Sequence, residues 1–111
     1  MTFEDAVAKA LAFRDERNWA QFHNPKDLAI SICLEASELL EAFQWSGGEL
    51  HVPAKQEYMT EELADVVVYC IYLADALDID LAKVVSEKID ANAKKYPVDK
   101  SWGTSRKYTE L

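Results

Sequence analysis

Two short acidic repeats interrupt otherwise apolar stretches, and they constrain the fold of this chain more than any other feature. They are Glu35-Ala36-Ser37-Glu38 and Glu62-Leu63-Ala64-Asp65. On an α-helix, residues three apart lie on one face with about 5–6 Å between their Cβ atoms, so each repeat points two carboxylates in one direction. Like charges at that spacing repel, and burying them beside leucines and valines adds a further cost unless something compensates. Because carboxylate oxygens are hard ligands, the repeats predict a site for Mg²⁺, with Mn²⁺ as a substitute.

A solvated helix face is the alternative interpretation of such repeats. Two observations favour a metal: the repeats fall on successive long helices that a short link would place side by side, and Asp65 lies where its helix has almost no polar face. Glu41 and Glu61 stay open, because either could join the cluster or replace a member of the second repeat. A helix-bundle di-iron site needs Glu-x-x-His on two helices, and neither His23 nor His51 follows a glutamate at that spacing.

Composition limits the class of protein. The chain has 111 residues, half of them hydrophobic, and a formal net charge of −8, so we expect one domain over residues 1–111 and no nucleic-acid polymer as partner. A nucleotide ligand stays open, since a cation can invert the local charge. The acidic N-terminus has no apolar signal core, and the apolar run around Val66–Leu77 is short and interrupted by acidic residues. We therefore expect a cytoplasmic protein with no membrane partner.

Hydrophobic periodicity and capping residues predict an all-α fold. Thr2 with Asp5 forms a capping-box pattern, and Asn24 and Asp80 are typical N-caps. The expected helices cover about 3–18, 25–45, 53–77 and 81–95, followed by an extended tail over 98–111. Short links between helices favour antiparallel neighbours, which predicts a four-helix bundle. The second and third helices are apolar on more than one face, so we expect them to contact other subunits in at least a dimer.

Aromatic residues accompany the acidic helices. Core packing explains most of them, but Trp19 and Trp45 lie at expected helix ends next to polar residues, where a large ring can flank a planar ligand. A nucleobase stacked on such a ring gains about 1–3 kcal/mol. Both tryptophans are therefore candidate contacts for a base.

Basic residues gather in the last quarter of the chain. Lys88, Asn92 and Lys95 share one face of the fourth helix, and Arg106-Lys107-Tyr108 follow in the tail. In so acidic a chain, such groups could bind phosphate oxygens. The alternative is a solvated helix end whose lysines interact with the helix dipole.

The two acidic repeats, in this order, resemble the paired motif of the all-α nucleoside triphosphate pyrophosphohydrolases, the MazG-like superfamily. Further segments look like those of its dCTP pyrophosphatase branch: Phe13-Arg14-Asp15-Glu16-Arg17-Asn18-Trp19-Ala20-Gln21-Phe22-His23, Phe43-Gln44-Trp45, Lys88-Ile89-Asp90-Ala91-Asn92, Lys95-Tyr96-Pro97-Val98 and Lys107-Tyr108-Thr109. The resemblance runs from about Phe13 to Thr109. It departs in one place that matters: relatives carry a histidine nine residues before the first tryptophan, where this chain has Ala10. The loop between Trp45 and Pro53 also looks shorter.

The resemblance implies a homotetramer built as a dimer of dimers. It implies Mg²⁺-dependent hydrolysis of a nucleoside triphosphate, dCTP above all, to the monophosphate and pyrophosphate, in the clearance of unwanted nucleotides. A dNTP pyrophosphohydrolase that also takes dATP or dUTP, and a non-catalytic helical interaction protein, are the alternatives.

The resemblance also implies a role for each candidate residue, and it selects Glu62 over Glu61. Glu38 would be the catalytic carboxylate that positions or deprotonates the attacking water. The implied metal ligands are Glu35, Glu38, Glu62 and Asp65, and the implied substrate contacts are Trp19, Trp45 and Tyr69 for the base or sugar and Lys88, Asn92, Lys95, Lys107 and Tyr108 for the phosphates.

Overall fold

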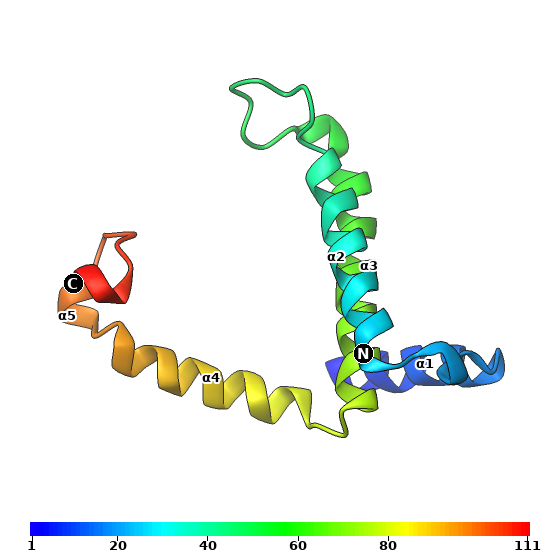
Figure 1. Ribbon diagram of the computed structural model, residues 1–111. Coiled ribbons are helices and arrows are strands. Elements are labelled where there is room, and N and C mark those ends of the chain that lie inside the picture. Colours follow the sequence, from blue (N-terminus) through cyan, green and yellow to red (C-terminus); the bar gives the residue numbers. More distant parts are fainter. The chain divides into compact units, whose positions relative to one another are not determined.

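Helices supply all of the regular secondary structure, as the hydrophobic periodicity predicts. The computed structural model describes residues 1–111, which form two compact units, Met1–Asp78 and Ile79–Leu111. The first unit holds α1 (Phe3–Glu16), η1 (Trp19–Phe22), α2 (Pro25–Glu41), η2 (Pro53–Lys55) and α3 (Gln56–Ala76), where η marks a 3₁₀ helix. The second unit holds α4 (Leu81–Lys95), α5 (Val98–Ser101) and η3 (Tyr108–Glu110) (Figure 1).

Three of the four predicted helix starts are confirmed by their caps. The Thr2 hydroxyl accepts a hydrogen bond from the Asp5 N–H at 3.1 Å, and the Asp5 carboxylate accepts one from the Thr2 N–H at 3.0 Å. Asn24 caps α2 through its side-chain oxygen, with Pro25 as the first helical residue. Asp80 caps α4 in the same way. These side chains satisfy N–H groups that have no partner inside their helix.

One predicted helix start, two predicted helix ends and the predicted tail are wrong. Helix α3 begins at Gln56 rather than at Pro53, and Pro53–Lys55 forms a 3₁₀ turn before it. Helix α1 ends at Glu16 rather than near Asn18, which takes a left-handed conformation with φ of 53°. Helix α2 ends at Glu41 rather than near Trp45, because its last turn tightens into bonds between residues three apart. The tail is not extended throughout: Val98–Ser101 forms a turn of α-helix and Tyr108–Glu110 a 3₁₀ turn.

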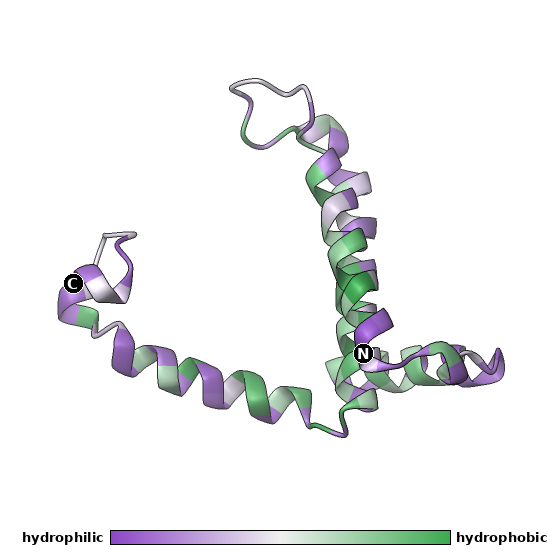
Figure 2. Cartoon of the chain, in the orientation of Figure 1, coloured by the Kyte–Doolittle hydropathy of each residue, from purple (hydrophilic) through white to green (hydrophobic).

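Helices α2 and α3 form an antiparallel pair, and α1 crosses this pair at the end where α2 begins and α3 ends (Figure 1). Figure 2 shows hydrophobic residues along both helices of the pair. The buried positions include Leu28 on α2, which is 1% exposed, and Ile71, Tyr72 and Ala74 near the end of α3. Despite these apolar runs, no helix has the length and hydropathy needed to span a membrane.

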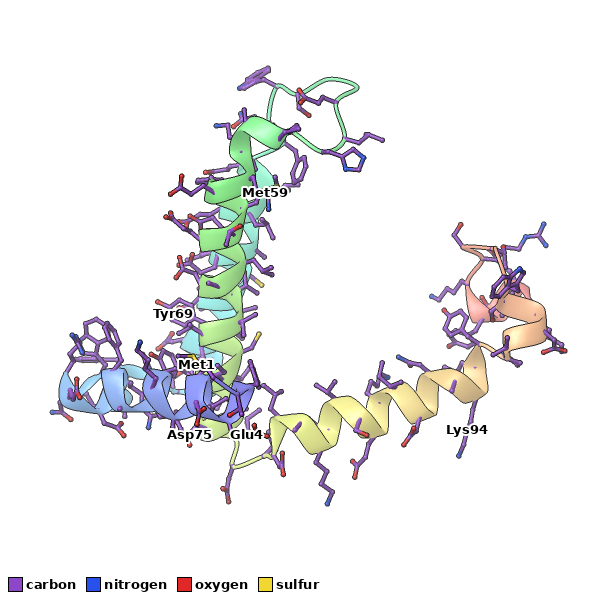
Figure 3. All side chains as sticks on the ribbon, turned by 180° about the vertical axis from the view of Figure 1, so that it is seen from behind. Met1, Glu4, Met59, Tyr69, Asp75 and Lys94 are labelled. Carbon is purple, nitrogen blue, oxygen red and sulfur yellow. The ribbon has the colours of Figure 1, made fainter.

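A buried arginine on α1 forms an ion pair with α3. Arg14 is 8% exposed, and its guanidinium donates to the Asp75 carboxylate at 2.6 Å and to the Asp15 carboxylate at 2.8 Å. Asp75 lies near the end of α3, where α1 passes (Figure 3). Beside this pair, the Tyr72 hydroxyl donates to the Ala10 carbonyl at 2.9 Å, and the Tyr72 ring stacks on His23 with centroids 5.0 Å apart. Burial, and then the nearby Arg14 charge, lower the pKa of His23.

We predict that Arg14→Ala destabilises the protein by about 2–3 kcal/mol, because it removes two charge-assisted hydrogen bonds and the packing between α1 and α3. Denaturant unfolding followed by circular dichroism measures this loss. Lys83→Ala is the matched control: its 3.9 Å ion pair with Glu87 is solvent-exposed, and such pairs contribute about 0–1 kcal/mol. Equal losses of unfolding free energy for the two variants would contradict the role of Arg14 in stabilising the contact between α1 and α3.

Candidate metal centre

Three carboxylates from α2 and α3 converge on one point. A ligand oxygen from each of Glu35, Glu62 and Asp65 lies within 4.8 Å of the others. Glu35 falls seven residues from both Leu28 and Ala42, which are 1% and 2% exposed, so the stripe of α2 that faces the core carries this glutamate too. Glu62 and Asp65 occupy one face of α3 at the spacing predicted from the repeat. Helix geometry thus brings three negative charges together at the contact between the two helices.

The surroundings of this cluster disfavour ionised carboxylates. Burial, followed by the neighbouring carboxylates, raises the pKa of Glu62 to about 7 and also raises the pKa of Glu35. One carboxylate oxygen of each residue, Glu35 Oε2 and Glu62 Oε2, is buried without a hydrogen-bond partner. Buried polar atoms normally have a partner, so these two oxygens need one. Hard carboxylate donors at this separation suit Mg²⁺ or Mn²⁺.

Glu38 lies at the exposed edge of the cluster. It is outside the group of three oxygens, but next to burial its hydrogen bonding and charge contribute most to the raised pKa values of Glu35 and Glu62. Its main chain is contacted from α3: the Tyr58 hydroxyl donates to the Glu38 carbonyl oxygen at 2.6 Å. The sequence pattern did not single out Tyr58, although its position four residues before Glu62 places both on one face of α3.

The structure places Glu61 and Glu41, whose membership of the cluster the spacing left open. Glu61 is exposed and is not part of the group of converging carboxylates. Glu41 lies one turn beyond Glu38, and one of its oxygens is 3.4 Å from the Tyr58 hydroxyl. Tyr58 therefore faces several acidic groups, and burial followed by these charges raises the pKa of its hydroxyl, which stays protonated as a donor.

The aromatic candidates lie at separate places in the first unit. Tyr69 projects from α3 one turn after Asp65 and is half-buried (Figure 3). Trp19 begins η1, before α2, and its ring packs edge-on against Phe13 with centroids 5.6 Å apart. Trp45 follows α2 in a turn with φ of 66° and is 93% exposed. The 17 residues of α2 lie between the two tryptophans, a separation of about 25 Å along the helix axis. The structure thus does not bring Trp19 and Trp45 of one subunit together.

The basic candidates all belong to the second unit. Lys88 and Asn92 lie on α4, and Lys88 borders an open apolar hollow lined by Val84, Val85 and Ile89. Lys95 and Tyr108 are brought together, because the tail turns back on the end of α4: the Lys95 amine is 4.9 Å from the Tyr108 ring centroid. Tyr96 packs edge-on against the same ring at 5.9 Å. Lys107 immediately precedes η3.

Comparison with known proteins identifies the family of this chain. A model of the MazG-like family matches residues 30–111, which include both acidic repeats, α4 and the tail. The chain belongs to the MazG-like family. The matched residues belong to both compact units.

Individual MazG-like relatives and a solved structure are close to this chain. The rat and human proteins named dCTP pyrophosphatase 1 are each 38% identical to it over 115 aligned positions, covering 99% of this chain and 68% of theirs. A crystal structure of a pyrophosphatase from Archaeoglobus fulgidus superposes with a TM-score of 0.77 at 39% sequence identity, covering 86% of this chain and 92% of that one. The helical fold of the MazG-like chain is therefore that of a known pyrophosphatase.

We predict that the cation-free protein loses stability as the pH rises from about 5 to about 8. The folded state holds the pKa of Glu62 at about 7, above its ordinary value of 4.5. Folding therefore favours protonated Glu62. Its protonation contributes fully to the free energy of unfolding below the pKa of the unfolded state, and this contribution is lost as the pH rises through the pKa of the folded state. Thermal unfolding in EDTA measures the trend. Glu62→Gln should flatten it and Glu61→Gln should not; identical pH profiles for these two variants would contradict the assignment.

Proposed function

We propose that this protein hydrolyses dCTP to dCMP and pyrophosphate with Mg²⁺. The observation that carries the proposal is the convergence of Glu35, Glu62 and Asp65, with two buried carboxylate oxygens that have no partner in the chain. Membership of the MazG-like family and relatives named dCTP pyrophosphatase 1 support both the reaction and the substrate. The role that follows is the clearance of unwanted nucleotides from the cytoplasmic pool.

Each acidic residue takes a part in this reaction. Glu35, Glu62 and Asp65, joined by Glu38, would hold Mg²⁺, which when bound offsets the negative charge of the carboxylates and of the triphosphate. Glu38 is exposed and lies outside the group of three converging oxygens, so its carboxylate can reach a water molecule next to the substrate. There it orients the water and accepts its proton. No side-chain nucleophile is required, because positioning and electrostatic stabilisation supply most of the catalysis of phosphoryl transfer.

The remaining candidates bind the nucleotide. Trp19 and Trp45 stack on the base, Tyr69 contacts the base or sugar, and Lys88, Asn92, Lys95, Lys107 and Tyr108 contact phosphates. Because the length of α2 separates Trp19 from Trp45 within a chain, a base held between them takes one tryptophan from each of two subunits. The binding site is then completed by a second copy of the chain.

Oligomerisation belongs to the same proposal. Ile30, Leu34 and Leu40 on α2 are 49%, 60% and 69% exposed, and an exposed apolar face of this kind is typical of a subunit interface. We infer a homotetramer, a dimer of dimers in which the helices complete four-helix bundles. We also infer that residues 1–111 act as one domain, which the match of the family model across both compact units supports.

A nucleotide panel tests the proposed reaction. Purified protein is incubated with each of the eight common NTPs and dNTPs, with Mg²⁺ or with EDTA, and pyrophosphate and monophosphate are measured. We expect release of both products in equal amounts, greatest with dCTP and abolished by EDTA. Comparable rates with dATP or dUTP would favour a broader dNTP pyrophosphohydrolase, and no cation-dependent release from any nucleotide would refute the enzyme.

Site variants sharpen the same assay. Glu38→Gln should lower kcat roughly 10²–10⁴-fold, the usual contribution of a general base. Glu61→Gln, an exposed neighbour of the cluster, is the control and should keep its activity. Full activity of both Glu38→Gln and Asp65→Asn would mean that the reaction takes place elsewhere on the protein.

Mixed oligomers test whether the site is shared. Trp19→Ala and Trp45→Ala should each raise KM and weaken the preference for dCTP, since each removes one stacking surface. When the two variants are co-expressed, a mixed pair of subunits contains one site in which both tryptophans are intact. We therefore expect mixtures to recover part of the low-KM activity. If Trp19 and Trp45 of the same subunit served one site, mixing would recover nothing.

A further inference from the structure

Tyr58 on α3 donates a hydrogen bond to the last turn of α2, the turn that carries Glu38. In a continuing helix the Ala42 N–H would donate to the Glu38 carbonyl, but here it donates to the Leu39 carbonyl at 3.2 Å. The next two N–H groups donate in the same tightened way to the carbonyls of Leu40 and Glu41. The regular bonds of α2 thus give way to tighter ones just after Glu38, as is common at helix ends. At this point the Tyr58 hydroxyl donates from α3 to the Glu38 carbonyl at 2.6 Å.

The contact joins the two halves of the acidic cluster. Tyr58, Glu62 and Asp65 follow one another on α3 at intervals of four and three residues, so they lie along one face. The same hydroxyl is 3.4 Å from a Glu41 oxygen, and the Lys55 amine is 5.8 Å from the ring centroid. The Tyr58 side chain therefore lies near a residue of α2, Glu41, and near Lys55, which immediately precedes α3. It is one turn before Glu62 on α3.

We propose that Tyr58 is a positioning residue, which sets the place of Glu38 relative to Glu35, Glu62 and Asp65 by holding the Glu38 main chain against α3. This inference rests on the proposed function, because it gives Glu38 a place in the cation site. The physical reason is the position of Glu38 in the last turn of α2, immediately before the tightened bonds that end the helix. A side chain on a fraying turn would not keep a fixed position, and misplacing a catalytic group by about 1 Å can lower a rate by roughly 10²-fold.

Tyr58→Phe tests the proposal, because it deletes the hydroxyl and keeps the ring. The first measurement is calorimetric titration of the cation-free protein with Mn²⁺ alone. We expect the Mn²⁺ affinity to fall about tenfold, as is usual when a group that orients a ligand is removed. Tyr72→Phe is the matched control, since the Tyr72 hydroxyl also donates to a main-chain carbonyl, that of Ala10. Its Mn²⁺ affinity should stay within about twofold of the wild type.

A double-mutant cycle with Glu38→Gln distinguishes positioning from a general structural effect. If Tyr58 acts through Glu38, Tyr58→Phe should change the Mn²⁺ affinity by no more than about twofold in the Glu38→Gln protein. The same tenfold loss in both backgrounds would overturn the proposal, as would an unchanged affinity of Tyr58→Phe in the wild type. Thermal unfolding of both tyrosine variants accompanies the titrations to show that each is folded.

The kinetic effect is a second readout. With dCTP and Mg²⁺, Tyr58→Phe should lower kcat and leave KM nearly unchanged, because Glu38 acts on the water and not on the base; a raised KM with an unchanged kcat would contradict the proposal. The Mn²⁺ titration requires no turnover. A wild-type protein that hydrolyses no nucleotide would therefore refute the proposed function, while the double-mutant cycle would still decide the role of Tyr58.

Discussion

The contact of α2 and α3 brings carboxylates close enough to repel one another. Glu35, Glu62 and Asp65 approach within 4.8 Å on helices that otherwise pack through apolar residues. Burial, followed by the neighbouring carboxylates, raises the pKa values of Glu35 and Glu62, so the fold disfavours full ionisation of the cluster. A divalent cation bound here would offset these charges, and we therefore propose that cation binding stabilises the folded protein.

The helices on either side keep the carboxylates in place against this repulsion. Leu28 packs within the first unit, and the buried Arg14 ties α1 to the end of α3 through Asp75. At the other end of the pair, Tyr58 holds the last turn of α2. The cluster thus lies between two contacts, the Arg14–Asp75 ion pair and the hydrogen bond from the Tyr58 hydroxyl to the Glu38 carbonyl. Such a framework can orient ligands whose mutual repulsion would otherwise separate them.

Local signals in the sequence were enough to predict the helices and the acidic faces. The caps at Thr2, Asn24 and Asp80 are each a short-range pattern, and the i, i+3 spacing alone defines which carboxylates share a face. What the sequence could not provide depends on contacts between distant residues. Spacing did not separate Glu62 from Glu61, for which the family resemblance was needed, and it did not reveal Tyr58, which bonds a residue 20 positions away.

We propose that the converging carboxylates bind a divalent cation. Crystals of the protein grown with Mn²⁺ and a non-hydrolysable dCTP analogue, with diffraction measured at the manganese absorption edge, test this binding. We expect an anomalous peak coordinated by Glu35, Glu62 and Asp65, with the triphosphate of the analogue next to it. Manganese and triphosphate bound elsewhere, with these three carboxylates free of metal, would contradict it.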